Sequence, residues 1–253
     1  GLGKTIQMIG LILCNFKTHN LIVLPRALVE QWYGIICRTL GHEPLLYHGR
    51  LAKGVTKEQL IAAPVVVTTY GMLAGVAEKP IKGRPLKYGP LHDVVWDRII
   101  FDEAHHLRNR NTRNHKAACH VRACHKWLVT GTPIQNGISD MFGLCAVLGL
   151  SKPFYVNRDN MAKVTSRLIL KRTKDVVGIE LPPLKRTIVT VPWSSEAEKQ
   201  LAEDIHVHLQ FSRLENGRED NPFANLGFHH FAMLQRARQS CIDMGLMKKN
   251  IEK

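Results

Sequence analysis

The stretch IIFDEAHHL, residues 99–107, joins an apolar run to two adjacent carboxylates. Residues 98–102 predict a buried strand, because short apolar runs suit strands that are covered on both faces. Asp102 and Glu103 would then stand at the tip of this strand, where α/β proteins place their sites. Such a pair can hold a metal ion through water and can orient or deprotonate an attacking water. The alternative is a strand followed by a solvated acidic turn.

The first residues, GLGKT, fit the second half of the phosphate-binding loop G-x-x-x-x-G-K-[ST]. Gly1 and Gly3 would bring backbone amides close to phosphate oxygens at the start of a helix. Lys4 would reach the β- and γ-phosphates of ATP, and Thr5 would ligate Mg²⁺. We expect the first half of the motif to lie before residue 1. Short Gly-Lys-Thr strings also arise by chance, so this fragment depends on the acidic pair for support.

A third motif, VTGTPIQN at residues 129–136, runs from an apolar strand into a loop of small residues. Thr130 and Thr132 offer hydroxyls, and Gly131 lets the backbone come close to a neighbour. Taken by itself the string is a plausible turn. Beside the carboxyl edge of a sheet, it would sense the γ-phosphate and contact His105. Three such motifs in this order make a chance occurrence improbable.

The composition indicates a globular protein and excludes a membrane-spanning one. The chain has 253 residues, of which 45% are hydrophobic and 22% are charged, as expected for a soluble globular protein. Its net charge of +14 favours a polyanionic partner, most often nucleic acid, over an uncommitted basic surface. Six scattered cysteines fit a reducing, intracellular compartment. No stretch approaches the roughly 20 apolar residues of a membrane span.

The pattern along the chain alternates short apolar runs with helical stretches, which predicts an α/β fold with a mainly parallel sheet. Trp32 and Trp127 are expected in its core. After residue 183 one further strand and a capping box at Ser195 and Glu198 introduce a helical region. The predicted strands are residues 21–24, 65–69, 98–102, 127–130 and 187–191, and the predicted helices are 27–40, 112–124, 138–148, 195–217 and one that contains 234–245.

These motifs resemble the first RecA-like lobe of Swi/Snf-family ATPases, the double-stranded-DNA translocases of helicase superfamily two. GLGKTIQ matches motif I, LIVLPRALVEQW motif Ia, VVVTTYGML motif Ib, FDEAHHLRN motif II and LVTGTPIQN motif III. LILKRTKDVV with LPPLKR resembles the family's "LRRTK … LPP" segment, and LQRARQSC resembles its "L-R-Q" helix. VWDR before motif II and the string LYHG lean towards the subgroup of the helicase-like transcription factor and the RNA polymerase II termination factor.

The resemblance implies a RecA-like P-loop lobe at residues 1–178, and a linker strand with a helical extension at 179–253. It implies the cofactors ATP and Mg²⁺, with Lys4, Asp102 and Glu103 as catalytic residues and Thr5 and Asp102 at the metal. It further implies a nuclear protein that couples ATP hydrolysis to movement along double-stranded DNA, in chromatin remodelling, transcription regulation or repair. His105, Thr130, Gly131 and Thr132 would complete the nucleotide site, and Pro25, Arg26, Thr69 and Tyr70 would contact phosphates of one DNA strand.

One departure from the family pattern and two alternative functions accompany this resemblance. In the family a second RecA-like lobe supplies the arginine fingers, and we expect it after Lys253. Because arginine fingers contribute about 10³–10⁵ in rate in related enzymes, the chain alone is expected to hydrolyse ATP weakly. One alternative is a non-catalytic module that binds DNA or a protein partner, such as a chromatin protein. The other is a strand-separating DEAH helicase, against which the Gln-Asn of TGTPIQN argues.

Overall fold

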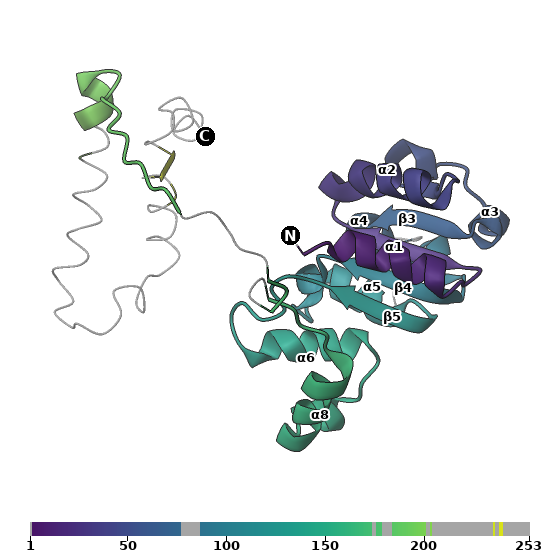
Figure 1. The fold of residues 1–253 in the computed structure, drawn as a ribbon. Coiled ribbons are helices and arrows are strands. Elements are labelled where there is room, and N and C mark those ends of the chain that lie inside the picture. Colours follow the sequence, from purple (N-terminus) through teal and green to yellow (C-terminus); the bar gives the residue numbers. More distant parts are fainter. Residues whose placement is uncertain are drawn as a thin grey trace. The chain divides into compact units, whose positions relative to one another are not determined.

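The computed structural model describes residues 2–76, 87–173, 176–178, 184–200, 203, 235 and 238–239. The chain divides into two compact units, Gly1–Glu180 and Leu181–Lys253. The first unit contains the sheet and its helices, labelled in Figure 1. Within the described residues, no helix has the length and apolar character that a membrane crossing requires.

Five strands form one sheet in the order β2-β3-β1-β4-β5, and every pair is parallel. The three central strands are almost entirely buried, as expected for a sheet with helices on both faces. The predicted α/β fold with a parallel sheet is therefore confirmed. The strands are β1 (Asn20–Leu24), β2 (Leu45–Tyr47), β3 (Val65–Thr69), β4 (Trp96–Asp102) and β5 (Ala123–Val129).

Helices connect the parallel strands, since a parallel pair needs a crossover connection. The α-helices are α1 (Lys4–Cys14), α2 (Val29–Leu40), α3 (Lys57–Ala62), α4 (Tyr70–Leu73), α5 (Arg113–His120), α6 (Ile138–Val147), α7 (Lys152–Val156) and α8 (Arg158–Leu168). Short 3₁₀ turns are η1 (Arg26–Leu28), η2 (Gly49–Ala52), η3 (Pro90–His92) and η4 (Ala104–Leu107).

The core lies in two layers, one on each face of the sheet. On one face α1 and α2 bury Ile9, Ile12, Trp32 and Ile36 against the strands. On the other face α4, α5 and α6 cover the strands, with Leu73, Ala117 and Leu144 among the buried residues. A smaller cluster joins α6 to α7 and α8, which pack on one another (Figure 1). The sheet is thus the middle of a three-layer unit.

A buried arginine holds the end of α1 at the amino edge of the sheet. Arg98 on β4 is only 2% exposed, and its guanidinium donates to the carbonyl oxygen and the Oδ1 of Asn15 at 2.7 and 2.8 Å. It also donates to Oδ1 of Asn20 on β1 at 3.1 Å. Because α1 is fixed at this end, its first turn with Lys4 keeps its place at the opposite, carboxyl edge.

Two sequence expectations near β5 are wrong. The helix predicted for residues 112–124 ends at His120, because Val121 takes an extended backbone, and Cys124 lies in β5. Trp127 is 41% exposed and does not belong to the core. β5 is the last strand of the sheet and is mostly accessible, so its apolar residues do not share the burial of the central strands. The strand β2 was not predicted.

The described part of the second unit is mostly extended and exposed. Residues 187–191 do not form the predicted strand, and Ile188 is 94% exposed. Ser195 starts a helical turn at 196–200, where its Oγ accepts the amide of Glu198 at 3.2 Å. The Glu198 carboxylate accepts the amide of Ser194, one residue before the position that a full capping box uses. Most of the predicted helices beyond residue 200 lies outside the described residues.

Helix α6 approaches the chain after β4 so closely that only glycine fits at one position. A Cβ added to Gly143 would overlap the carbonyl oxygen of Arg108. We therefore expect Gly143→Ala to lower the free energy of unfolding by about 1–3 kcal/mol, the usual cost of overpacking a rigid contact. Chemical unfolding in urea measures this change.

The matched control is Gly10→Ala on α1, where an added Cβ meets nothing within 4 Å. Alanine is the better helix former, so this variant should gain up to about 1 kcal/mol. Equal effects of the two substitutions would show that the close approach of α6 is not a constraint on the fold.

Candidate nucleotide site at the carboxyl edge of the sheet

The carboxyl ends of β1, β3, β4 and β5 meet at one edge, since all the strands are parallel. The chain leaves this edge at Pro25, Tyr70, Glu103 and Thr130. The first turn of α1 lies at the same edge, because Lys4 contacts the loop after β5. All three sequence motifs therefore converge where α/β proteins bind their ligands.

Lys4 occupies the first turn of α1, behind a glycine in the left-handed conformation. Gly3 has φ 71° and ψ 29°, which suits glycine at the entry to the helix. The ammonium of Lys4 lies 4.0 Å from Oε1 of Glu103. A Cβ added to Gly131 would lie 3.7 Å from the same ammonium, an ordinary contact distance, so Lys4 lies beside the loop after β5. Gly1 lies outside the described residues.

Asp102 is a buried carboxylate at the last position of β4. It is 4% exposed; its Oδ2 accepts the indole N–H of Trp32 at 2.8 Å, and its Oδ1 accepts the amide of Glu103 at 2.9 Å. Burial raises the pKa of Asp102, and the two donors oppose this rise by favouring the charged form. Its carbonyl oxygen accepts the hydroxyl of Tyr70 at 2.6 Å. Both ends of the residue are thus fixed.

Glu103 has a strained backbone. Its φ of 49° makes it the one non-glycine residue with positive φ in the described part of the chain. This conformation costs about 1–2 kcal/mol and tends to persist where function requires a side chain in a given direction. Here it coincides with a carboxylate that lies between the Lys4 ammonium and Nδ1 of His105, the latter at 3.2 Å from Oε2.

The loop after β5 is tied to His105 and to itself. Nδ1 of His105 lies 3.3 Å from Oγ1 of Thr130, as the sequence analysis expected. The amide of Thr132 donates to the same hydroxyl oxygen at 3.2 Å, and the Gln135 side-chain amide donates to Oγ1 of Thr132 at 3.1 Å. Both threonine hydroxyls therefore shape the loop, and Thr130 links it to motif II.

A carboxylate on α6 holds the far end of this loop. Oδ2 of Asp140 accepts the backbone amides of Gln135 and Asn136, each at 2.9 Å. These bonds lower the pKa of Asp140, so the residue is charged at neutral pH. The sequence analysis missed Asp140, because an acidic residue in the first turn of a helix also suits the helix dipole without any loop contact.

The four residues expected to contact DNA divide into two pairs. Pro25 and Arg26 follow β1, and Arg26 is exposed at the start of η1. Thr69 and Tyr70 follow β3, but both are buried. Thr69 Oγ1 accepts the amide of Met72, and burial raises the pKa of Tyr70 well above its usual value. A phosphate contact by the Tyr70 side chain does not agree with this structure, in which Tyr70 supports Asp102 from within.

The donor set suits Mg²⁺ and nucleotide phosphates. Asp102 and Thr5 supply the carboxylate and hydroxyl oxygens that Mg²⁺ prefers, and Thr5 follows Lys4 in the first turn of α1. The N-terminal turn of an eleven-residue helix, with a lysine in it, favours phosphate. Among the described residues, the Lys4 ammonium has only the 4.0 Å ion pair with Glu103, so it is available to an anionic ligand.

Trp32 was predicted only as a core residue, and its bond to Asp102 gives it a second role that can be tested. We expect Trp32→Phe to lower the free energy of unfolding at neutral pH by about 1.5–3 kcal/mol, the value of a hydrogen bond to a charged group. The lost packing of the indole adds to this decrease. Without this donor the folded pKa of Asp102 rises further. Stability then falls more steeply as pH rises through the interval between the unfolded and folded pKa values.

Urea unfolding without Mg²⁺ at several pH values measures this loss, which should shrink as pH falls through the folded pKa of Asp102. Trp96→Phe is the control, because that buried indole donates to a neutral carbonyl, of Leu91, at 3.0 Å. The decrease in the free energy of unfolding that Trp96→Phe causes should not change with pH. Parallel pH profiles for the two variants would contradict a charged acceptor at Trp32.

Comparison with known proteins agrees with this geometry. The SNF2-related domain family matches residues 1–246. The DNA repair protein RAD5 of Kluyveromyces lactis is 32% identical over 262 residues, covering 91% of this chain and 22% of that protein. A putative SWI/SNF-related matrix-associated actin-dependent regulator of chromatin, subfamily A member 3-like 1, of Arabidopsis thaliana is 29% identical over 270 residues. These cover 96% of this chain and 28% of that protein.

The fold is also shared with a solved structure, the SWI2/SNF2 ATPase core of Sulfolobus solfataricus in complex with dsDNA. The TM-score is 0.56 at 21% sequence identity, over 98% of this chain and 53% of that one. The predicted RecA-like lobe is thereby confirmed as the fold. With its family match over nearly the whole sequence, the chain belongs to the SNF2-related ATPase domain family.

Proposed function

We propose that this chain is the ATP-binding lobe of a motor that couples ATP hydrolysis to movement along double-stranded DNA. The observation that carries the proposal is the convergence of Lys4, Glu103 and the loop of Thr130 at one edge of the sheet. The K. lactis relative is named a DNA repair protein, and the S. solfataricus structure contains dsDNA. The first name supports a role in DNA repair and the second supports binding to double-stranded DNA, and we further propose that the protein acts in the nucleus, in repair or chromatin remodelling.

The site residues divide the work of hydrolysis between them. Lys4 and the first turn of α1 would bind the β- and γ-phosphates, and Asp102 and Thr5 would hold Mg²⁺. The ion supplies charge neutralisation of the phosphate oxygens when it is bound. Glu103 would orient the attacking water and accept its proton, because its strained backbone directs the carboxylate towards Lys4.

His105 gives the site a path to its surroundings. Its Nδ1 contacts both the Glu103 carboxylate and the Thr130 hydroxyl. A shift of Glu103 on loss of the γ-phosphate would therefore also shift the loop of residues 130–136. This loop is tied in turn to α6 through Asp140. We propose that the connection transmits the nucleotide state to the DNA-binding surface, as two-state elements do in other switches.

The DNA surface is proposed at the loops that follow β1 and β3. Arg26 is exposed there, and the net charge of +14 favours a sequence-independent contact with phosphates. Arginine fingers are expected from a second RecA-like lobe, so we propose that this chain alone hydrolyses ATP slowly and binds it well. Chromatin proteins are further proposed partners, in line with the name of the A. thaliana relative.

Titration with Mg²⁺-ATP by calorimetry tests the nucleotide site. Lys4→Ala should weaken ATP binding at least about tenfold, since it removes the charge that faces the β- and γ-phosphates. Lys57→Ala is the matched control, because Lys57 is exposed on α3 and outside the motifs. Binding of ATP that is equal in both variants would contradict the assignment of GLGKT to the phosphates.

Duplex DNA binding of the same proteins provides the second readout. Lys4→Ala should leave the affinity for DNA unchanged. Arg26→Ala should weaken the dependence of DNA affinity on salt concentration by about one released counterion. DNA binding that does not depend on salt would argue against a phosphate-backbone contact and in favour of a module for a protein partner.

A further inference from the structure

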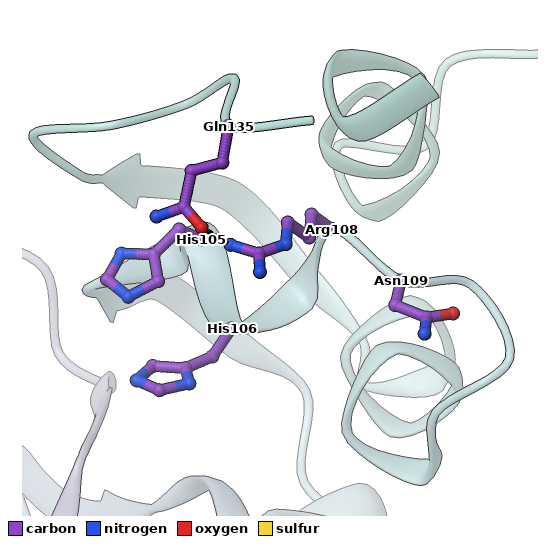
Figure 2. Close-up of a pocket in the computed structure, with 5 residues that line it drawn as sticks. All are labelled: His105, His106, Arg108, Asn109 and Gln135. Atoms are coloured by element: carbon purple, nitrogen blue, oxygen red, sulfur yellow. Dashed lines mark hydrogen bonds between the residues drawn. The ribbon is translucent and has the colours of Figure 1, made fainter. Parts of the chain in front are cut away.

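A hollow of about 340 Å³ has His105 in its lining (Figure 2), and the same residue contacts Glu103 of the candidate nucleotide site. Its walls come from the turn after β4 and from the loop after β5. The lining residues are cationic or neutral, and none is a carboxylate: His105, His106, Arg108, Asn109 and Gln135. Such a lining favours an anion.

Arg108 is held in place by a neutral side chain and forms no ion pair within the described residues. Figure 2 shows its side chain reaching towards Gln135, and its Nη1 donates to Oε1 of that residue. Gln135 is itself fixed by its bond to Thr132. A guanidinium has five N–H donors, so most remain for a ligand. No carboxylate of the described residues forms an ion pair with Arg108.

Two other lining residues also retain donors. The Oδ1 of Asn109 accepts the amide of Asn111 at 3.0 Å, which leaves the side-chain NH₂ without a partner among the described residues. His105 uses Nδ1 towards Glu103 and Thr130, which leaves Nε2. The ring of His106 lies 4.6 Å from that of His105 and 5.6 Å from that of Tyr70.

The carboxylates next to the hollow already have partners. Glu103 lies between Lys4 and His105, and Asp140 accepts two backbone amides of the motif III loop. Neither forms an ion pair with Arg108, although the charge of Arg108 is one of the causes that lower the pKa of Asp140. An anion that enters the hollow would meet the guanidinium of Arg108, which its bond to Gln135 holds in place.

We propose that this hollow is a second phosphate-binding site, separate from the one at Lys4. A planar guanidinium fits two oxygens of a phosphate group, and the remaining donors suit its other oxygens. The phosphate can come from two sources, orthophosphate released at the adjacent nucleotide site or the backbone of bound DNA. The site itself does not require that the chain hydrolyse ATP.

The test uses the whole chain carrying Lys4→Ala, which removes phosphate binding at the α1 loop. Calorimetry at constant ionic strength measures the affinity for inorganic phosphate. Fluorescence anisotropy with a 20-base-pair duplex measures the affinity for DNA. In this background Arg108→Gln should weaken the affinity for one of these two ligands at least about tenfold. Arg113→Gln is the control, because Arg113 is exposed at the start of α5 and does not line the hollow.

Each outcome decides the matter. A loss only with inorganic phosphate supports the site and identifies the released product as its ligand, and a loss only with the duplex identifies the DNA backbone. Equal affinities of Arg108→Gln and Arg113→Gln for both ligands, with circular dichroism showing both variants folded, overturn the proposal. The result is independent of the ATP titration, because Lys4 is already absent from every protein compared.

Discussion

The buried carboxylate of Asp102 is the interaction on which the rest of the site depends. It lies at the end of β4, one of the three central strands, and its two oxygens accept the Trp32 indole N–H and the amide of Glu103. The Tyr70 hydroxyl fixes the carbonyl of the same residue from below. With this anchor in place Glu103 can hold a left-handed backbone, which the chain would otherwise avoid. A charge that costs free energy to bury thus sets the geometry of the Asp102–Glu103 pair.

The parallel sheet then brings together segments that are far apart in the sequence. Each strand delivers its following loop to the same edge, so Lys4, Glu103 and Thr130 become neighbours without any local sequence signal for their contact. Helix α6 completes the edge from outside. It holds the last loop through Asp140 and touches the backbone of Arg108 at Gly143. The nucleotide site and the neighbouring phosphate hollow therefore share one support.

Much of this could be predicted from the sequence. The apolar runs indicated four of the five strands, and the resemblance of the motifs to a known family indicated the family, because both signals are local. The failures have different causes: Trp127 is exposed on an edge strand, Tyr70 is buried where a DNA contact was expected, and residues 187–191 form no strand. The acceptor of the Trp32 indole could not be predicted either, since a buried N–H needs a partner but the sequence does not say which.

The central claim is that the three motifs form one site for Mg²⁺-ATP. Hydrogen–deuterium exchange of the whole chain, with and without Mg²⁺-ATP, tests it most directly because it reports on each loop separately. The account predicts slower exchange in residues 2–7, 102–108 and 130–136 together, with no change in α3, which lies away from these loops in the sequence. Protection of only one of these loops, or of none, at saturating nucleotide would contradict it.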